Sequence, residues 1–457
     1  METSDAKSLS TDSSHSTTPN STSTYKYSHE SFETFRKKVG ALAHDIGSKS
    51  LENIVRISGG SFNRIIAADL HSHETASTIQ KVVLRIPRFA EDTDPLNEDI
   101  RNQYSILDAT AKLGLRVPRV LAYDCTSNNA LGMPFSLQTR LEGQALDLTY
   151  GDLTITERLS TASELVRLLA AIENMKFPNP GRLECSGAVP DRHGIGKVDD
   201  TSPMDILQVQ GFGVGVGSSR SKPTSPSPTS LRELLSTQFD AWIQHKLADD
   251  PTETFDAGMF QRLKKIYSEM DELGFFEDRA SLNSNVLYHW DLEPRNILIE
   301  RNTTVPSSDA SEEHHVQITG VLDWDDALSV PPILARKPPI WLWDFSDDET
   351  LPSSVLAHYY GDMDLIPPEL YSDARTRLSK EDLQVKKFFE SEITTKLYGD
   401  TSSASREAYL DDAYGRGRWI RRLWRFALEG FYDSQHISRY EDFDKDWTEY
   451  RKTQVIA

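Results

Sequence analysis

The segment that most constrains this chain is a polar loop held between two short apolar runs. Residues 286–288 (Val-Leu-Tyr) come before the loop, and residues 297–299 (Ile-Leu-Ile) follow it. Short apolar runs bounded by turn residues favour buried strands. The loop itself has the pattern His-x-Asp-x-x-x-x-Asn, from His289 to Asn296. We therefore expect a strand, a polar loop and a second strand, with the polar side chains gathered at one end of the strands.

A second apolar run ends in an acidic cluster. Residues 318–322 (Ile-Thr-Gly-Val-Leu) are followed by Asp-Trp-Asp-Asp, which begins at Asp323. Phosphoryl transfer needs a carboxylate that orients an attacking hydroxyl and accepts its proton, and it needs oxygen ligands that hold Mg²⁺ against phosphates. Asp291, Asn296 and Asp323 are residues of these types, so the two segments together favour this chemistry.

Residues 289–298 together with residues 322–326 resemble the aminoglycoside phosphotransferase family, taken broadly to include many fungal members. That family is similar in fold to protein kinases and has choline-kinase-like relatives. The resemblance implies Asp291 as catalytic base, Asn296 and Asp323 as Mg²⁺ ligands, and ATP as phosphate donor. Protein kinases carry Asp-Phe-Gly where this chain has Asp-Trp-Asp, which favours a kinase of small molecules.

The resemblance also reaches the region that would bind the nucleotide. Residues 58–64 resemble the turn that covers the phosphates, and residues 135–143 resemble the strand whose backbone meets adenine. Arg85 stands where the better-studied enzymes have a phosphate-contacting Lys, with Glu98 as its partner, and Lys and Arg are not equivalent at such a site. Both residues fit exposed charges equally well. The implied nucleotide-binding residues are Gly59, Gly60, Ser61, Asn63, Arg85, Glu98, Gln138 and Leu141.

Each motif residue also has a purely structural interpretation. His289 fits an anchor of the loop better than a proton shuttle. Asp291 has an alternative as a loop cap, Asn296 as a turn residue and Asp323 as a helix cap, but their joint occurrence favours the chemical roles. Asp325 fits a residue that supports the site better than a ligand of a second metal ion.

We expect an ATP- and Mg²⁺-dependent phosphotransferase that acts on a hydroxyl of a small molecule, namely an amino sugar, an amino alcohol or a related metabolite. The alternative is a nucleotide-binding pseudokinase scaffold without turnover, which Arg85, Trp290 and Glu293 support because they are atypical at their positions. A protein kinase is less favoured because no Ala-Pro-Glu segment follows Asp323.

The pattern of strands and helices predicts an α+β, two-lobed, protein-kinase-like fold. We expect a disordered Ser/Thr-rich tail over residues 1–28 and a nucleotide-binding lobe over residues 29–142, which begins with a helix and is built on an antiparallel sheet. A mainly helical lobe with the catalytic loop follows over residues 143–457. Within it, residues 178–230 are rich in Gly, Pro and Ser, which predicts a loop-rich insertion.

The bulk composition excludes some classes of partner. The formal net charge is −20 and the pI is about 5.1, which argues against nucleic acid because phosphate backbones need a basic surface. No apolar run is long enough to predict a membrane-spanning helix. The chain has two cysteines, no apolar leader and no Arg before Arg36, so we expect reduced thiols and a cytoplasmic location. The pattern does not predict an oligomeric state.

Three patterns imitate other kinds of site. The glycine run 211–217 imitates a dinucleotide fingerprint, but we expect neither a buried strand before it nor a helix after it. Residues 312–315 (Glu-Glu-His-His) imitate a metal site, but neighbouring residues of a hairpin point in different directions. The basic stretch 416–425 imitates a nucleic-acid-binding surface, but in so acidic a chain we expect it to be a solvated face of a core helix.

Overall fold

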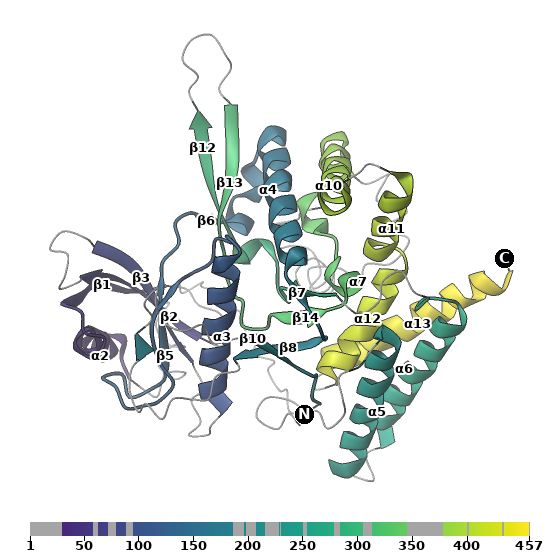
Figure 1. Cartoon of the computed structure of the whole chain (residues 1–457), viewed down its shortest axis with the longest axis horizontal. Coiled ribbons are helices and arrows are strands. Elements are labelled where there is room, and N and C mark those ends of the chain that lie inside the picture. Colours follow the sequence, from purple (N-terminus) through teal and green to yellow (C-terminus); the bar gives the residue numbers. More distant parts are fainter. Residues whose placement is uncertain are drawn as a thin grey trace, which may run out of the picture. The chain divides into compact units, whose positions relative to one another are not determined.

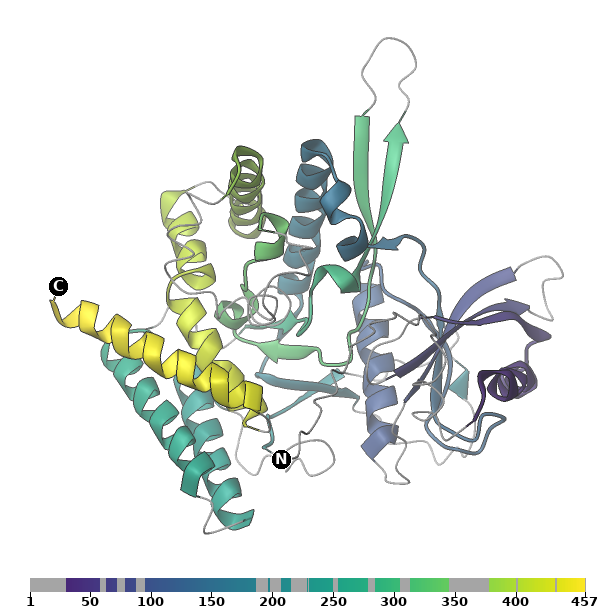
Figure 2. The same ribbon diagram turned by 180° about the vertical axis from the view of Figure 1, so that it is seen from behind.

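The computed structural model describes residues 30–57, 63–71, 79–87, 95–185, 196–197, 207–214, 228, 230–249, 254–277, 284–304, 313–344, 378–399, 402–431 and 434–456. The chain forms two compact units. The smaller comprises residues up to 93 with 122–137 and 193–197, and the larger comprises the remainder. Helices and antiparallel sheets occur together (Figures 1 and 2), so the predicted α+β class is confirmed. The expected tail 1–28 lies outside the described residues.

The smaller unit is built on a six-stranded sheet, which helix α2 (Phe32–Asp45) packs against through its first strand. Along the third strand, every second residue from Val82 to Ile86 is buried, as a half-buried strand requires. Helix α2 begins after Ser31, whose hydroxyl accepts a hydrogen bond from the Thr34 amide. The strand order is β1 (Ser50–Arg56), β2 (Asn63–His71), β3 (Ile79–Pro87), β5 (Phe135–Thr139), β4 (Val120–Asp124) and β9 (Gly196–Lys197).

The larger unit contains two further sheets and most of the helices. The five-stranded sheet has the order β10 (Leu207–Gln210), β8 (Gly181–Cys185), β14 (Leu328–Val330), β11 (Asn285–Tyr288) and β7 (Lys176–Phe177). The three-stranded sheet has the order β13 (Glu313–Val321), β12 (Ile297–Thr304) and β6 (Gln144–Ala145), and β12 and β13 form a hairpin beside α4 (Figure 1). The helices are α3 (Pro95–Lys112), α4 (Ile155–Asn174), α5 (Leu231–Asp249), α6 (Thr254–Glu272), α7 (Pro332–Ala335), α10 (Lys380–Tyr398), α11 (Ser403–Ala413), α12 (Arg416–Glu429) and α13 (Ser434–Ile456).

Short turns of 3-10 helix connect several of these elements. They are η1 (Leu146–Leu148), η2 (Tyr150–Asp152), η4 (Pro294–Asn296) and η5 (Ile340–Leu342). Within the described ranges, no helix is both long enough and apolar enough to cross a membrane.

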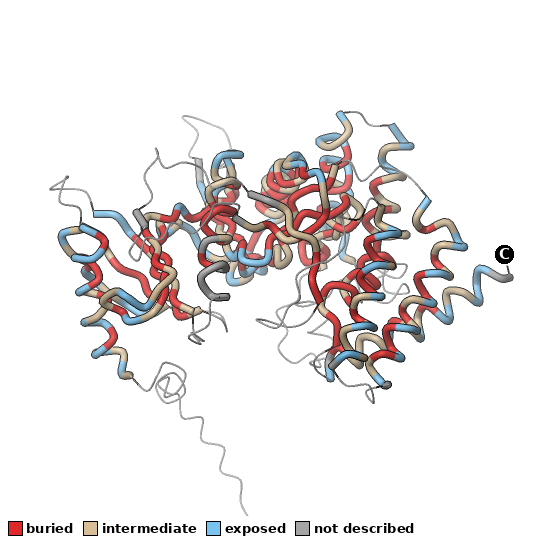
Figure 3. Tube along the Cα trace, turned by 60° about the horizontal axis from the view of Figure 1, so that its bottom comes forward, coloured by how far each residue is buried: buried red, intermediate tan, exposed pale blue. Residues whose placement is uncertain are grey.

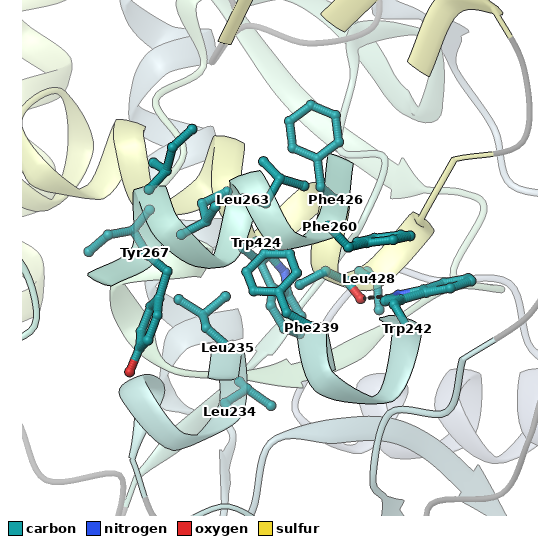
Figure 4. Packing of buried hydrophobic residues seen from close by; sticks show 14 of the residues in the cluster. Leu234, Leu235, Phe239, Trp242, Phe260, Leu263, Tyr267, Trp424, Phe426 and Leu428 are labelled. Atoms are coloured by element: carbon teal, nitrogen blue, oxygen red, sulfur yellow. Dashed lines mark hydrogen bonds between the residues drawn. The ribbon is translucent and has the colours of Figure 1, made fainter. Parts of the chain in front are cut away.

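An aromatic core joins α5, α6 and α12 (Figure 4). The rings of Trp242 and Phe260 stack at 5.3 Å, and the Trp242 indole N–H donates to the carbonyl of Ala427 at 2.8 Å. Gly430 lies directly after α12 with φ +74°, and a Cβ there would lie 2.6 Å from the Trp242 ring. Only glycine tolerates both constraints at once. Figure 3 shows how such buried positions alternate with exposed ones around the helices.

The basic stretch on α12 is not the solvated face that the sequence predicts. Arg418, Arg421 and Arg422 are all buried. Arg421 donates to the backbone carbonyls of Asp412 and Ala413 at 2.7 and 2.5 Å, so it satisfies the end of the preceding helix α11. The prediction was wrong because a guanidinium group can be buried when carbonyl and aromatic groups surround its five donors.

The expected loop-rich insertion contains paired strands. Strands β8 and β10 pair from Leu207 opposite Cys185 to Gln210 opposite Arg182. Strand β10 therefore lies directly before the glycine run 211–217, and its residues 209 and 210 are only partly buried. Phe212 and Val214 are buried in the aromatic core, which gives the start of this run a packing role.

Candidate active site

The predicted polar loop begins at the end of β11, an inner strand of the five-stranded sheet. Residues 285–287 are buried, and β11 pairs with β14 on one side and β7 on the other. The loop ends in η4, where the Asn296 amide donates to the carbonyl of Glu293 at 2.9 Å. Pro294 suits the first position of this turn because it has no amide hydrogen to satisfy. The predicted succession of strand, loop and strand is confirmed.

Asp291 is held by the residues that follow it in the loop. The Asn296 side-chain amide donates to both the carbonyl oxygen and the Oδ2 of Asp291, each at 2.9 Å. Arg295 donates to Asp291 Oδ1 at 2.5 Å. Each carboxylate oxygen keeps further acceptor capacity, since an ionised carboxylate has about four acceptor sites. The carboxylate is therefore oriented by the protein itself and stays partly exposed.

His289 connects the loop to the segment that carries Asp323. Its Nδ1 accepts from the Asp291 amide at 3.2 Å, so Nε2 carries the hydrogen and donates to the carbonyl of Leu322 at 2.9 Å. Burial lowers the pKa of His289, which keeps the ring neutral. The ring also contacts Trp324 edge-on, with centroids 4.6 Å apart. These contacts fit an anchor of the loop.

Leu322, the residue before Asp323, makes backbone hydrogen bonds with two residues of the loop. The Leu322 amide donates to the carbonyl of Asn296 at 2.8 Å, and the Leu322 carbonyl accepts from His289. Asp323 then adopts φ +64°, a left-handed conformation that non-glycine residues rarely take. Such a conformation persists only where its surroundings enforce it, and Asp323 is exposed. The structure thus brings Asp291, Asn296 and Asp323 together.

The oxygen atoms of this site suit a Mg²⁺ ion. The Asn296 side chain donates its hydrogen bonds through Nδ2, and none of the described residues donates to its Oδ1. The described part of the chain contains no cluster of three His, Cys, Asp or Glu residues able to hold a metal ion by themselves. Mg²⁺ is usually held by one or two protein oxygens together with substrate phosphates and water. Asn296 Oδ1 and the Asp323 carboxylate fit that donor set.

Asp325 is bound to a residue that the sequence interpretation did not identify. Gln103 of α3 donates to Asp325 Oδ1, and Gln138, at the end of β5, donates to Gln103 Oε1 at 3.2 Å. Gln103 and Gln138 are both buried. This chain of contacts gives Asp325 a supporting place beside Asp323. No local sequence signal points to Gln103, because the contact joins residues 222 positions apart.

The predicted nucleotide-binding residues are placed as follows. Gly59, Gly60 and Ser61 lie outside the described residues, as does the side chain of Glu98, although its backbone belongs to α3. Asn63 begins β2 opposite Pro87, and Arg85 on β3 lies opposite Ile65. Leu141 packs so closely on Gly320 that a Cβ at Gly320 would lie 2.4 Å from its side chain. The roles of these residues stay predictions.

A family model described as "Phosphotransferase enzyme family" matches residues 64–334, which is more than half of the chain. The match includes Asp291, Asn296 and Asp323. It confirms the resemblance that the two motifs predict.

Curated fungal relatives match at low identity. "Altered inheritance of mitochondria protein 9, mitochondrial" from Candida glabrata is 23% identical over 367 residues, which is 67% of this chain and 53% of the relative. Its namesake from Debaryomyces hansenii is 30% identical over 45% of this chain and 32% of the relative. A subtelomeric hrmA-associated cluster protein from Aspergillus fumigatus is 21% identical over 79% of this chain and 71% of that protein. The chain thus spans about half or less of the length of the first two relatives.

These names contradict the predicted cytoplasmic location, because several of the relatives are named as mitochondrial proteins. The prediction rested on the lack of an apolar leader and of early Arg residues. Such features bear on secretion and on one kind of transit peptide, whereas cellular addresses are read by receptors in more than one form.

Solved aminoglycoside phosphotransferases are similar at still lower identity. The apo form of a thermostable APH(4)-Ia mutant is 13% identical with a TM-score of 0.41, covering 91% of this chain and 99% of that chain. The streptomycin–ATP ternary complex of APH(2'')-IIa is 12% identical with a TM-score of 0.44, covering 91% and 97%.

Proposed function

Because this chain belongs to the phosphotransferase enzyme family, we propose that it moves the γ-phosphate of ATP, with Mg²⁺, onto a hydroxyl of a small molecule. The predicted acceptor classes were an amino sugar, an amino alcohol or a related metabolite. The observation that carries the proposal is the arrangement of the catalytic loop. Asn296 bonds the Asp291 carboxylate, and the same loop bonds both the amide and the carbonyl of Leu322, the residue before Asp323.

The side chains of this site account for the steps of transfer. The acceptor hydroxyl oxygen forms a bond to the γ-phosphorus while the bond from that phosphorus to the bridging oxygen of ADP breaks. Asp291 accepts the hydroxyl proton, and Arg295 and Asn296 keep the carboxylate in place to receive it. Asn296 Oδ1 and Asp323 would hold Mg²⁺, which neutralises charge on the phosphates. ADP then leaves with the broken P–O bond's electrons.

We assign the nucleotide contacts to the residues that the resemblance implies. Gly59, Gly60, Ser61 and Asn63 would place backbone and short polar groups against the phosphates. Arg85, with Glu98, would supply the cation on the phosphates, and the backbone from Gln138 to Leu141 would meet adenine. The buried Gln138 side chain bonds Gln103, which is consistent with recognition by the backbone alone.

The direct test replaces Asp291 by Asn, which preserves its size and removes the base. We expect Asp291→Asn to bind Mg²⁺-ATP as wild type does and to lose about 10²–10⁴-fold in turnover, the usual contribution of a general base. Single-turnover phosphate transfer and nucleotide titration measure the two properties. Arg167→Ala, on the exposed face of α4, is the control and should change neither. A full single-turnover rate in Asp291→Asn contradicts the proposed role.

The second candidate is a nucleotide-binding scaffold without turnover. Arg85 supports it, because this residue on β3 replaces the Lys of the better-studied enzymes. Acceptor-stimulated ATP consumption by the wild-type protein would exclude this candidate. Nucleotide binding without consumption across amino sugars, amino alcohols and uncharged alcohols would favour it.

A further inference from the structure

We propose that a pocket beside the catalytic loop binds the acceptor, and that its chemistry selects an uncharged alcohol with an apolar body, such as an aryl or alkyl alcohol. The inference rests on the proposed phosphotransfer and puts an uncharged acceptor in place of the amino sugar and amino alcohol that the sequence resemblance favours. The pocket lies wholly within the larger unit. Its walls come from α4, α10, α11, residues 335–341 and residues 287–293.

The pocket lies against the loop that carries the proposed base. Trp290 and Leu292, the two neighbours of Asp291 in sequence, both line it, and so does Glu293. Trp290 contacts Tyr288 edge-on at 5.9 Å, and Tyr288 also lines the pocket. Asp291 itself does not line the pocket, so the hydroxyl of a bound alcohol would have to extend past Trp290 or Leu292 to reach its carboxylate.

The walls of the pocket are mainly apolar and aromatic. Leu165, Leu169 and Ile172 lie four and three residues apart on α4, so they form one apolar stripe. Trp341 and Tyr409 add aromatic surface to other parts of the wall. Pockets of this kind bind the body of a ligand by apolar contact and use few polar groups to orient it.

The charged side chains that line the pocket are paired with one another. Arg336 bonds Glu173 at 2.5 Å and Asp412 at 2.7 Å, and the Lys337 ammonium lies 3.4 Å from Glu293. A bound polycation would have to give up its hydration or break one of these ion pairs. Both cost free energy, and the carboxylates Glu173 and Glu293 already have cationic partners, so neither compensates that cost. The negative net charge of the whole chain therefore does not make this pocket a site for cations.

A packing gap without function is the competing explanation, and a pair of filling variants separates the two. Leu169→Phe on α4 and Ala335→Leu on α7 enlarge side chains that line the pocket from different elements, and both positions are only partly buried. Leu148→Phe is the matched control, because Leu148 is 77% exposed and lies outside the pocket.

Ligand-observed NMR of 2-phenylethanol and of streptomycin, without nucleotide, measures binding independently of turnover. We expect 2-phenylethanol to bind wild type and Leu148→Phe, and to bind both filling variants about fivefold or more weakly, which corresponds to the roughly 1 kcal/mol or more that overpacking costs. We expect no streptomycin binding in the pocket. Absence of 2-phenylethanol binding to wild type, equal binding to the filling variants, or streptomycin binding that the filling variants abolish would each overturn the inference.

The transfer assay then separates this inference from the proposed function. If 2-phenylethanol binds as expected but Mg²⁺-ATP is never consumed, the pocket stands and phosphotransfer fails. If ATP is consumed with streptomycin at equal rates in wild type and both filling variants, phosphotransfer stands and the pocket assignment fails.

Discussion

Leu322 is the residue through which the two halves of the candidate site meet. Its amide bonds the carbonyl of Asn296 and its carbonyl bonds His289, so the catalytic loop fixes the backbone just before Asp323. The sequence motifs single out His289, Asn296 and Asp323 by their residue types and spacing. They do not reveal that two backbone hydrogen bonds of an ordinary leucine join them, because backbone bonding depends on the fold and not on the side chain.

At the same scale, Gln103 offers a prediction that no motif suggests. In Gln103→Glu an oxygen replaces the amide that donates to Asp325, while an acceptor for Gln138 remains. We expect the free energy of unfolding at pH 7 to fall by about 1 kcal/mol or more, because a hydrogen bond becomes a contact between like charges. Denaturant unfolding measures it. Asp108→Ala on the same helix is the control, since its ion pair with Lys112 is exposed and of small value. Equal stability of Gln103→Glu and wild type would show that the contact between Gln103 and Asp325 does not contribute to the free energy of unfolding.

Among the elements, helix α4 is bonded to β12, the strand that follows the polar loop of the site. The Thr154 hydroxyl and the Glu157 carboxylate form a capping box at its start, and Glu157 also accepts two hydrogen bonds from Arg301 of β12, at 2.8 and 3.0 Å. One carboxylate thus begins the helix and ties it to the strand that leaves the catalytic loop. Leu165, Leu169 and Ile172 of the same helix line the proposed acceptor pocket.

This contact predicts a pH-dependent contribution to stability. Burial alone would raise the pKa of Glu157, but the bonds from Arg301 and Thr154 outweigh it and hold the pKa below its usual value of 4.5. A lowered pKa in the folded state stabilises the protein above about pH 4.5, and this contribution is lost as pH falls through the folded-state pKa. Glu157→Gln should therefore lower the free energy of unfolding by about 1–2 kcal/mol at pH 7, with a difference from wild type that shrinks below pH 4.5.

Urea unfolding of both proteins at pH 7 and near pH 3.5 checks this prediction. Glu164→Gln, at an exposed ion pair on the same helix, is the control and should match wild type at both values. If the free energy of unfolding differs between Glu157→Gln and wild type by the same amount at both pH values, the charge of Glu157 does not stabilise the start of α4.

Hydrophobic period accounts for most elements that the sequence predicts. Alternation in β3 and the 3.6-residue period in α2 and α4 appear as buried faces in the structure, whereas α12 is buried on nearly all sides. The strands β8 and β10 escaped prediction because their region is rich in Gly, Pro and Ser, and their stability comes from pairing within a five-stranded sheet. The buried arginines of α12 escaped it because their partners lie in other segments, namely backbone carbonyls for Arg421 and the Asp446 carboxylate for Arg422.

For the whole molecule, the sequence predicts the class of fold and the family correctly, and the family match bears out the latter. The motifs also locate Asp291, Asn296 and Asp323, which the structure gathers. The cytoplasmic location was predicted wrongly, because the lack of an apolar leader and of early Arg residues does not exclude the mitochondrial location that the names of several relatives carry. The acceptor class depends on the pocket, whose lining residues run from Leu165 to Tyr409 and share no local pattern.

The central claim is that the larger unit holds Mg²⁺-ATP through Asn296 and Asp323, and thermal unfolding tests it most directly. Asp323→Asn is the variant of choice, because Asn tolerates the left-handed conformation at φ +64° and removes the charge. A ligand that binds only the folded state must raise Tm. The account predicts that saturating Mg²⁺-ATP raises the Tm of wild type and raises that of Asp323→Asn much less. No shift in wild type, or equal shifts in both proteins, would contradict it.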